Sequence, residues 1–384
     1  MLLIAAPGQG AQAPGFLAAW LELPGFADRL AAWSDLAGCD LIRCGSTASA
    51  EEIRDTAVAQ PLLVAAAIAA ADELFGGIGQ ATRLAAAAAG HSVGELPAGT
   101  IAGVISPEDA LRLVRVRGQA MARAAAAEPT GMTAVLGGDE AEVLAAIEKH
   151  GLTPANVNGA GQIVAAGTME QLDAFAADPP ARARLMPLSV AGAFHTRHMA
   201  PAVDDLRAAA VNVTARDPFL PLLSNRDGAV VRTGADWLER IVTQVAAPVR
   251  WDKCMQAMTG LGVSAIIELP PAGTLTGLAR RALPGVQLAA MKTPDSLQSA
   301  RRLIAEHGQA DADSHAPEWR LLVAPLAGVF RASSAGTPGV AVTSGAELGQ
   351  VEMRGGNHLV TPSFPATIIE WLVEDGRASC RERV

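Results

Sequence analysis

The chain has 384 residues, of which 50% are hydrophobic and only 18% are charged. This length favours one large domain with an appendage, or two to three domains, and the composition is too apolar for a disordered chain. Thirty basic residues against 39 acidic residues give a net charge of −9, which argues against a surface built to bind nucleic acid or anionic lipid.

The cysteines and the N-terminal residues bear on where the protein works. The four cysteines show neither metal-ligand spacing nor the density of a disulfide-stapled secreted domain, which fits a reducing cytoplasm. The apolar run at residues 2–6 stops at Pro7-Gly8 without a basic region before it, so a signal peptide is not expected. Because no uninterrupted apolar stretch approaches the roughly 18 residues of a spanning helix, we expect a cytoplasmic protein that binds no membrane.

The hydrophobic pattern predicts alternating strands and helices. Residues 2–6 favour a short buried strand that runs into a glycine-rich turn, and residues 107–127 favour a helix with Pro107 in its first turn. Between residues 129 and 187 shorter units indicate a small inserted α+β lobe, with elements at 133–136, 140–149, 154–158, 163–166, 170–176 and 185–190. The other expected elements are a buried helix at 61–74, a strand or close-packed element at 84–89, and segments of the larger fold at 221–224, 237–244, 265–269 and 277–282.

The C-terminal quarter has a different character. A helix and linker are expected at 296–318, and a β-rich tail at 319–375, in which residues 323–325 (VAP) are echoed by residues 360–362 (VTP). The last residues, 376–384, break this pattern and match one reading frame of a common sequencing-library adapter. We hypothesise that they are not native sequence.

A serine and a histidine are the first candidates for chemistry. Residues 90–94 fit G-x-S-x-G, in which small flanking residues permit a tight strand-to-helix turn that exposes the hydroxyl of Ser92. Such a serine needs a general base, and His195 is the candidate, although its position alone fits a structural histidine as well. His195 and His198 form an H-x-x-H pair without a third ligand at zinc-like spacing, so no metal is expected.

The glycine-rich loop at residues 7–13 allows two uses. It contains G-x-G-x-x-A after a strand, which permits a dinucleotide-binding turn. The second strand with an acidic end that such a site requires is missing, because Asp28 lies inside a helical pattern. The other use of the loop is to aim a backbone N–H at a developing oxyanion, and no cofactor is then needed.

Several short motifs occur together and in one order. They are P-G-Q-G-x-Q at 7–12, G-H-S-x-G-E at 90–95, R-G-x-x-M at 117–121, F-H-[ST] at 194–196 and Q-x-x-x-P-V-x-W at 244–251. The chain resembles the malonyl-CoA:acyl carrier protein transacylases in these motifs, over roughly residues 1–295. The match is specific because chance does not supply the whole ordered set.

The resemblance implies the catalytic roles. Ser92 would attack the thioester of malonyl-CoA, and His195 would take its proton and return it to the leaving thiol. The backbone carbonyl of Gln244 would orient the histidine, in place of a carboxylate. The backbone N–H groups of Gln9 and Val93 would bind the oxyanion.

The resemblance also implies the substrate pocket. Arg117 would grip the free malonyl carboxylate through two hydrogen bonds, although a surface arginine on a helix is the alternative for this residue alone. Phe194 would fill the space of an extra methyl group and so select malonyl over methylmalonyl units. Further residues expected in the pocket are Met121, Asn156, Asn158 and His91, with turn-forming asparagines as the alternative reading of the asparagine pair.

The implied fold is α/β, with an α/β-hydrolase-like large lobe at 1–128 and 191–295 and an inserted ferredoxin-like lobe at 129–190. A small β-rich C-terminal segment follows, and it resembles part of a biotinyl or lipoyl module. Those modules carry their group on a lysine, and no lysine follows Lys292. The tail is therefore expected to be a docking or structural remnant.

The predicted function is transfer of malonyl from malonyl-CoA to the phosphopantetheine thiol of acyl carrier protein through a malonyl-Ser92 intermediate. The expected partners are malonyl-CoA and acyl carrier protein, without nucleic acid, and a monomer is expected. A serine hydrolase or thioesterase, and a non-catalytic docking subunit, remain alternatives. A trans-acting polyketide acyltransferase shares the same chemistry and is not separated from a fatty-acid enzyme by the sequence.

Overall fold

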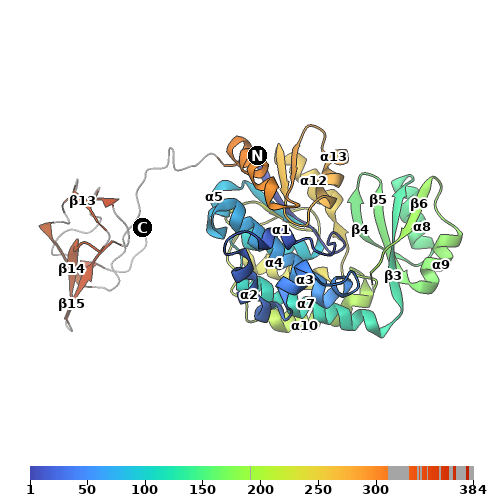
Figure 1. Ribbon diagram of the computed structural model, residues 1–384, viewed down its shortest axis with the longest axis horizontal. Helices are drawn as coiled ribbons and strands as arrows, with labels where there is room; N and C mark the ends of the chain where they lie inside the picture. Colours follow the sequence, from blue (N-terminus) through green and yellow to red (C-terminus); the bar gives the residue numbers. More distant parts are fainter. Residues whose placement is uncertain are drawn as a thin grey trace. The chain divides into compact units, whose positions relative to one another are not determined.

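The computed structural model divides into two compact units, Met1–Ala312 and Asp313–Val384 (Figure 1). The structure describes residues 1–190, 192–309, 328–334, 337, 340–343, 345–353, 356–362, 366–368 and 378–379.

A six-stranded sheet forms the centre of the first unit, with the order β11-β10-β1-β2-β7-β8. Neighbouring strands run parallel except for β7 and β8, which pair antiparallel. The strands are β1 (Leu2–Ala6), β2 (Ala87–Gly90), β7 (Leu222–Leu223), β8 (Val230–Val231), β10 (Ala265–Glu268) and β11 (Gln287–Ala290). Since β1 and β2 are buried on both faces, they consist of continuous apolar or small residues, as parallel strands covered on both sides do.

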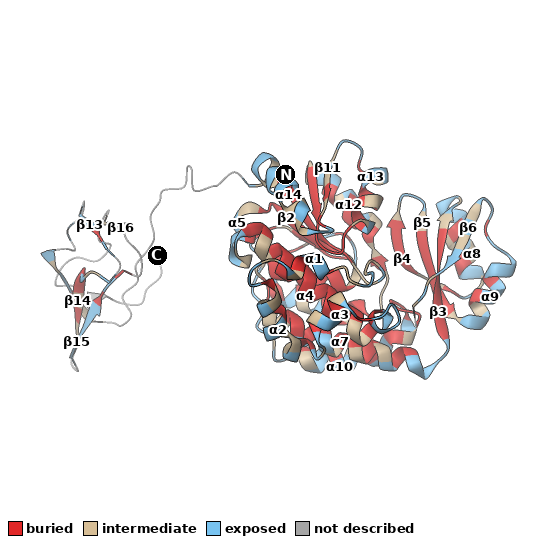
Figure 2. Ribbon diagram, in the orientation of Figure 1, coloured by how far each residue is buried: buried red, intermediate tan, exposed pale blue. Residues whose placement is uncertain are grey.

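Helices surround this sheet, and the central ones are buried along most of their length (Figure 2). Helix α4 packs against α7, and Gly118 of α7 permits the contact because an added Cβ would lie 2.8 Å from the carbonyl oxygen of Thr56. The helices of the first unit outside the small lobe are α1 (Ala18–Leu21), α2 (Phe26–Ala37), α3 (Leu41–Ser46), α4 (Thr56–Phe75), α5 (Ala81–Leu84), α6 (Glu95–Ile101), α7 (Pro107–Ala127), α10 (Ala200–Ala210), α11 (Gly234–Gln244), α12 (Trp251–Gly260), α13 (Thr274–Ala282) and α14 (Leu297–His307).

Among the described residues, α4 alone is long and apolar enough to cross a membrane by length and composition. Its sequence is not an uninterrupted apolar run, because Gln60 and Asp72 lie within it. However, 83% of its most apolar window is buried inside the protein. The helix is therefore accounted for as the core helix of the first unit.

The small lobe contains a second sheet with the order β6-β3-β5-β4-β9. Its elements are β3 (Thr130–Gly137), α8 (Glu140–Lys149), β4 (Thr153–Gly159), β5 (Gln162–Thr168), α9 (Met169–Ala177), β6 (Ala183–Pro187) and β9 (Val249–Arg250). Strand β9 comes from the chain that follows α11, and it pairs in parallel with β4. The lobe is thus tied to the segment after Gln244 by backbone hydrogen bonds, which no sequence pattern indicated.

The predicted elements of the first unit mostly agree with the structure. The helices at 107–127 and 140–149 have the expected bounds. The expected element at 84–89 is wrong as a unit, because α5 ends at Leu84 and β2 begins only at Ala87. Helices α10 and α12 and strand β11 were not expected.

The second unit is β-rich in its described residues. Its strands are β12 (Gly328–Ala332), β13 (Ala341–Val342), β14 (Gly349–Met353), β15 (Gly356–Val360), β16 (Ala366–Thr367) and β17 (Ala378–Ser379). They form a sheet with the order β15-β14-β12-β17 and a separate pair β13-β16. Phe330, Val351 and Val360 of the sheet form a small core. Residues 323–325 of the internal echo, and all of 376–384 except β17, lie outside the described residues.

Candidate active site

The turn that carries Ser92 is forced by close packing of its glycines. Strand β2 ends at Gly90, a 3₁₀ turn at Ser92–Gly94 follows, and α6 begins at Glu95. A Cβ on Gly90 would overlap the carbonyl of Gly94, and one on Gly94 would overlap the carbonyl of Ala6. Ser92 itself has φ +54°, a left-handed conformation that residues other than glycine adopt only where the surroundings fix it. The G-x-S-x-G spacing is therefore a steric requirement of this strand-to-helix turn.

His195 lies within hydrogen-bond distance of the serine. Its Nε2 is 2.7 Å from Ser92 Oγ, and its Nδ1 is 2.9 Å from the carbonyl oxygen of Gln244. Since a carbonyl only accepts, Nδ1 carries the proton and Nε2 is left to accept the proton of the serine hydroxyl. Burial, and then the positive charge of Arg117, lower the pKa of His195 to about 3, so the imidazole is neutral near pH 7.

Arg117 brings a buried positive charge to the same oxygen. Its side chain comes from α7 and is almost fully buried, with Nη2 3.3 Å from Ser92 Oγ. The guanidinium also donates to two amide oxygens, Gln60 Oε1 at 2.6 Å and Gln244 Oε1 at 2.8 Å. Burial lowers the pKa of Arg117 to about 10, so the group stays charged at neutral pH. All three acceptors are uncharged, and this arrangement suits an anionic group of a substrate.

The loop after β1 leaves the sheet beside the serine turn. Ala6 pairs with Gly90 at the carboxyl ends of the parallel strands β1 and β2, and the N–H of His91 donates to the Ala6 carbonyl at 2.9 Å. Gln9 of this loop is anchored by its Nε2, which lies 3.2 Å from Thr56 Oγ1. Gln9 and Val93 therefore belong to two loops at one edge of the sheet.

The small lobe contributes a second group of the expected residues. Asn156 and Asn158 lie on β4 and are both buried. Asn158 Oδ1 is 2.9 Å from Nε2 of His91, so β4 is joined directly to the serine turn. The ring of His91 also packs against Trp251 at 5.7 Å between centroids, and burial lowers its pKa.

The last two expected residues are buried near the same groups. Phe194 directly precedes His195 and belongs to the main hydrophobic cluster of the unit. Met121 Sδ lies 3.4 Å from Gln60 Nε2, so Gln60 links Met121 to the guanidinium of Arg117.

Sequence reasoning missed three polar residues of this network. Glu95 is buried, accepts the N–H of Asn225 at 2.8 Å on Oε1, and accepts Nε2 of Gln244 on Oε2. Burial raises the pKa of Glu95 to about 8. Glu95 could have been found because it directly follows the serine motif, and Gln60 because it is polar within the apolar run of α4. Asn225 has no such signal in the sequence.

Residues 6–293 match the family model of the acyl transferase domain. The chain belongs to the acyl transferase domain family. It is 53% identical over 308 residues to the malonyl CoA-acyl carrier protein transacylase of Mycobacterium tuberculosis, covering 79% of this chain and 100% of that protein. It is 34% identical over 304 residues to the protein of the same name from Escherichia coli K12, covering 77% of this chain and 97% of that one.

Solved structures give the same result for this acyl transferase. The crystal structure of MCAT from Mycobacterium tuberculosis aligns with a TM-score of 0.75 at 53% identity, over 78% of this chain and 99% of that one. A malonyl-transacylase in complex with a type II polyketide synthase acyl-carrier protein aligns with a TM-score of 0.72 at 31% identity, over 78% and 99% respectively. The mixed α/β fold of the first unit is therefore that of the MCAT structures.

The acyl transferase has no metal cluster in the part of the chain that the structure describes: no group of three or more histidine, cysteine, aspartate or glutamate side chains could hold an ion there. The two histidines of the H-x-x-H pair have different partners. His195 contacts Ser92 and Gln244, whereas Nδ1 of His198 lies 2.9 Å from Glu128 Oε2.

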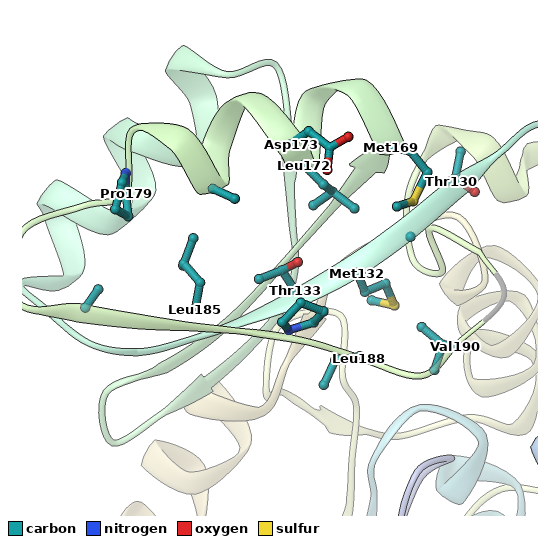
Figure 3. Close-up of a pocket in the computed structure, with 14 residues that line it drawn as sticks. Thr130, Met132, Thr133, Met169, Leu172, Asp173, Pro179, Leu185, Leu188 and Val190 are labelled. Carbon is teal, nitrogen blue, oxygen red and sulfur yellow. The ribbon is translucent and has the colours of Figure 1, made fainter.

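A cavity of about 460 Å³ lies away from the serine, on the small lobe of the acyl transferase. Its lining comes from β3, α9, β6 and the segment after β6, with Met132, Leu172 and Leu185 among the side chains that face it (Figure 3). Ser92, His195 and Arg117 do not line it. This hollow is therefore separate from the groups that could react.

Proposed function

We propose that the protein transfers the malonyl group of malonyl-CoA to the phosphopantetheine thiol of an acyl carrier protein, for chain extension in fatty-acid or polyketide synthesis. The names of the relatives at 53% identity support this activity, and one similar structure holds an acyl-carrier protein. The observation that carries the proposal is the approach of two groups to one oxygen: Ser92 Oγ is 2.7 Å from a neutral imidazole and 3.3 Å from a buried guanidinium.

In the first half-reaction Ser92 Oγ attacks the thioester carbonyl, and its proton moves to Nε2 of His195. The Gln244 carbonyl holds the other ring nitrogen, so the imidazolium keeps its orientation. The backbone N–H groups of Gln9 and Val93 stabilise the oxyanion. As the C–S bond breaks, the imidazolium returns the proton to the thiolate of CoA, which leaves malonyl-Ser92.

Arg117 selects the acyl group. A malonyl carboxylate replaces uncharged acceptors with a charged one, and the planar guanidinium can hold it through two hydrogen bonds. Phe194, next to His195 and buried, limits the space for a branched acyl chain. Met121, Asn156, Asn158 and His91 complete the wall around these groups.

In the second half-reaction the phosphopantetheine thiol replaces CoA. Its proton moves to the neutral His195 and its sulfur attacks the ester carbonyl of malonyl-Ser92. The bond between that carbon and Ser92 Oγ then breaks, the proton passes from His195 to Ser92 Oγ, and malonyl is left as a thioester on the carrier. Holding the malonyl carboxylate on Arg117 keeps the ester in one orientation while the carrier approaches. We infer that the acceptor is the carrier thiol and not water.

We further infer the finer architecture and the setting of this activity. The succession β3-α8-β4-β5-α9-β6 with the strand order β6-β3-β5-β4 supports a ferredoxin-like lobe inserted at 129–190 into an α/β-hydrolase-like lobe. Residues 296–318 are then a helix and linker, and 319–375 a β-rich tail. The enzyme works in the cytoplasm, as a monomer and without a cofactor. Sedimentation of the full chain tests the monomer.

The function is tested by the intact-protein mass after mixing with malonyl-CoA, in parallel for wild type, Ser92→Ala and Arg117→Ala. We expect a malonyl adduct on the wild type, none on Ser92→Ala, and a smaller amount on Arg117→Ala. Addition of a carrier protein bearing phosphopantetheine should discharge the adduct onto the carrier. Steady hydrolysis of malonyl-CoA without transfer would establish a hydrolase, and untouched malonyl-CoA would establish a docking subunit.

A further inference from the structure

Asn225 is a fully buried residue that contacts both sides of the serine turn. Its Oδ1 accepts the backbone N–H of Ser92 at 2.6 Å, and its Nδ2 donates to the carbonyl oxygen of Gly90 at 2.7 Å. The two hydrogen bonds span His91. One carboxamide therefore fixes the backbone before and after that residue.

The sheet brings Asn225 to this place. Strand β7 pairs with β2 in parallel, with Ala88 opposite Leu222 and Ala89 opposite Leu223. The chain after β7 consequently leaves the sheet next to the chain after β2, although the two segments are 133 residues apart. A left-handed residue such as Ser92 persists only where its surroundings hold it, and Asn225 supplies such support.

Glu95 connects the Asn225 loop to the rest of the site. One carboxyl oxygen accepts the backbone N–H of Asn225 at 2.8 Å, and the other accepts Nε2 of Gln244. Gln244 in turn supplies the carbonyl for His195 Nδ1 and the amide oxygen for Arg117. A continuous set of hydrogen bonds thus links the serine, the base and the guanidinium.

We propose that Asn225 is a positioning residue for acyl transfer: its carboxamide sets the backbone at Ser92, and Glu95 holds the Asn225 loop in register with Gln244. The inference rests on the proposed function only in taking Ser92 as the nucleophile. The carboxamide of Asn225 bonds to main-chain atoms of the serine turn and to the side chains of Gln244 and Cys254, and not to the Ser92 hydroxyl. Its loss should therefore lower the rate of attack and leave the binding of malonyl-CoA nearly unchanged.

The test uses a fluorophosphonate, which forms a P–O bond with an activated serine hydroxyl and releases fluoride. The rate constant for labelling of Ser92 is measured for wild type, Asn225→Ala and Asn225→Asp, per folded enzyme in the native fraction from gel filtration. Because a displacement of about 1 Å at a reacting group costs about 10²-fold in rate, we expect a loss of that size for Asn225→Ala. The KM for malonyl-CoA should stay near that of wild type while kcat falls.

The isosteric variant Asn225→Asp gives a signature that a merely structural role would not. An ionised aspartate turns an oxygen toward the Gly90 carbonyl, whereas a protonated one can donate to that carbonyl and still accept the Ser92 N–H. Between about pH 7 and pH 5 its labelling rate should therefore rise as the pH falls, while that of wild type stays level because His195 remains neutral in this range. The charged or titratable groups near this loop include Glu95, Cys254, Arg117, Arg240, Asp227, Asp252, Arg226, Arg250 and His91.

Glu268→Gln is the matched control. Glu268 is a fully buried carboxylate of β10 that accepts the backbone N–H groups of Gly273, Leu275 and Thr276 at 2.8 to 2.9 Å, away from the serine turn. It should lower the melting temperature and leave the labelling rate per folded enzyme unchanged, whereas Glu95→Gln should lower both.

The outcomes separate this proposal from the proposed function. Wild-type labelling rates in Asn225→Ala, or an Asn225→Asp profile parallel to that of wild type, would overturn the positioning role even if malonyl transfer is intact. If Asn225→Ala yields no folded protein, the pH profile of Asn225→Asp decides. If the wild type reacts with the fluorophosphonate but takes no malonyl group, the proposed function is contradicted. The labelling rates would still test the role of Asn225.

Discussion

The serine turn and the small-lobe cavity differ in the chemistry of their side chains. At the turn, the buried side chains of His195 and Arg117 lie 2.7 and 3.3 Å from the hydroxyl oxygen of Ser92, which is itself partly exposed. The cavity offers about 460 Å³ but is lined mainly by apolar side chains and small polar ones. Polar contacts between distant segments, and not the volume of a cavity, therefore mark the residues that could react.

Removal of the general base, His195, should have the largest effect on the reaction. His195→Ala should lower the rate of malonyl-Ser92 formation by about 10⁴-fold, because a positioned general base contributes up to that factor. Rapid-quench mass spectrometry measures this rate. His198→Ala is the matched control, since His198 is on the same segment but contacts Glu128, and its rate should equal that of wild type. Equal losses in both variants would show that His195 has no special role.

The guanidinium can be tested separately from the nucleophile. Arg117→Lys keeps a positive charge but loses the planar pair of donors, so the preference for malonyl-CoA over acetyl-CoA should fall by about 10²-fold in kcat/KM. Arg123→Lys on the same helix is the control, because Arg123 is exposed and pairs with Asp205. A preference that survives in Arg117→Lys would mean that another group reads the carboxylate.

The pH dependence of the acylation rate tests the electrostatic environment of His195. Burial and the charge of Arg117 lower the pKa of His195 from 6.5 to about 3, so the acylation rate should persist well below pH 6.5 and fall only near pH 4 or lower. The unfolded chain binds a proton at the ordinary pKa, so wild type should lose stability relative to His195→Gln as the pH falls from 6.5 toward 3. Stopped-flow rates and urea unfolding across this range measure both, and a half-point of the rate near pH 6.5 would contradict this environment.

Parts of the site are predictable because their cause is local. Gly90 is required by atoms of the turn itself and Gly94 by the end of the neighbouring strand at Ala6, so the five-residue motif alone already predicts the serine turn. The family resemblance predicts roles for Gln244 and Arg117, through the motifs at 244–251 and 117–121. Glu95 was within reach of the same reasoning, because a buried carboxylate directly after the nucleophile needs partners.

Other parts are set by pairing between distant strands and have no local signal. Asn225 reaches Ser92 only because β7 pairs with β2, and β7 is two residues long. The same holds for β9, a two-residue strand that joins β4 after α11. The alanines of β2 form a strand because β1 and β7 flank them on both sides, so tertiary pairing overrides the low strand propensity of alanine.

Substitutions at the small-lobe cavity should have the smallest effect on the reaction. Met169 is half exposed and lines the small-lobe cavity, whereas Met186 is similarly exposed on the same lobe and does not line it. Met169→Trp narrows the cavity, and Met186→Trp adds the same ring outside it. Exposed substitutions of this kind usually change free energies by less than about 0.5 kcal/mol, so both variants should acylate and transfer within about 2-fold of wild type. If Met169→Trp alone slows the discharge of malonyl onto the carrier protein, the cavity takes part in the reaction, and the separation between the hollow and the reacting groups does not hold.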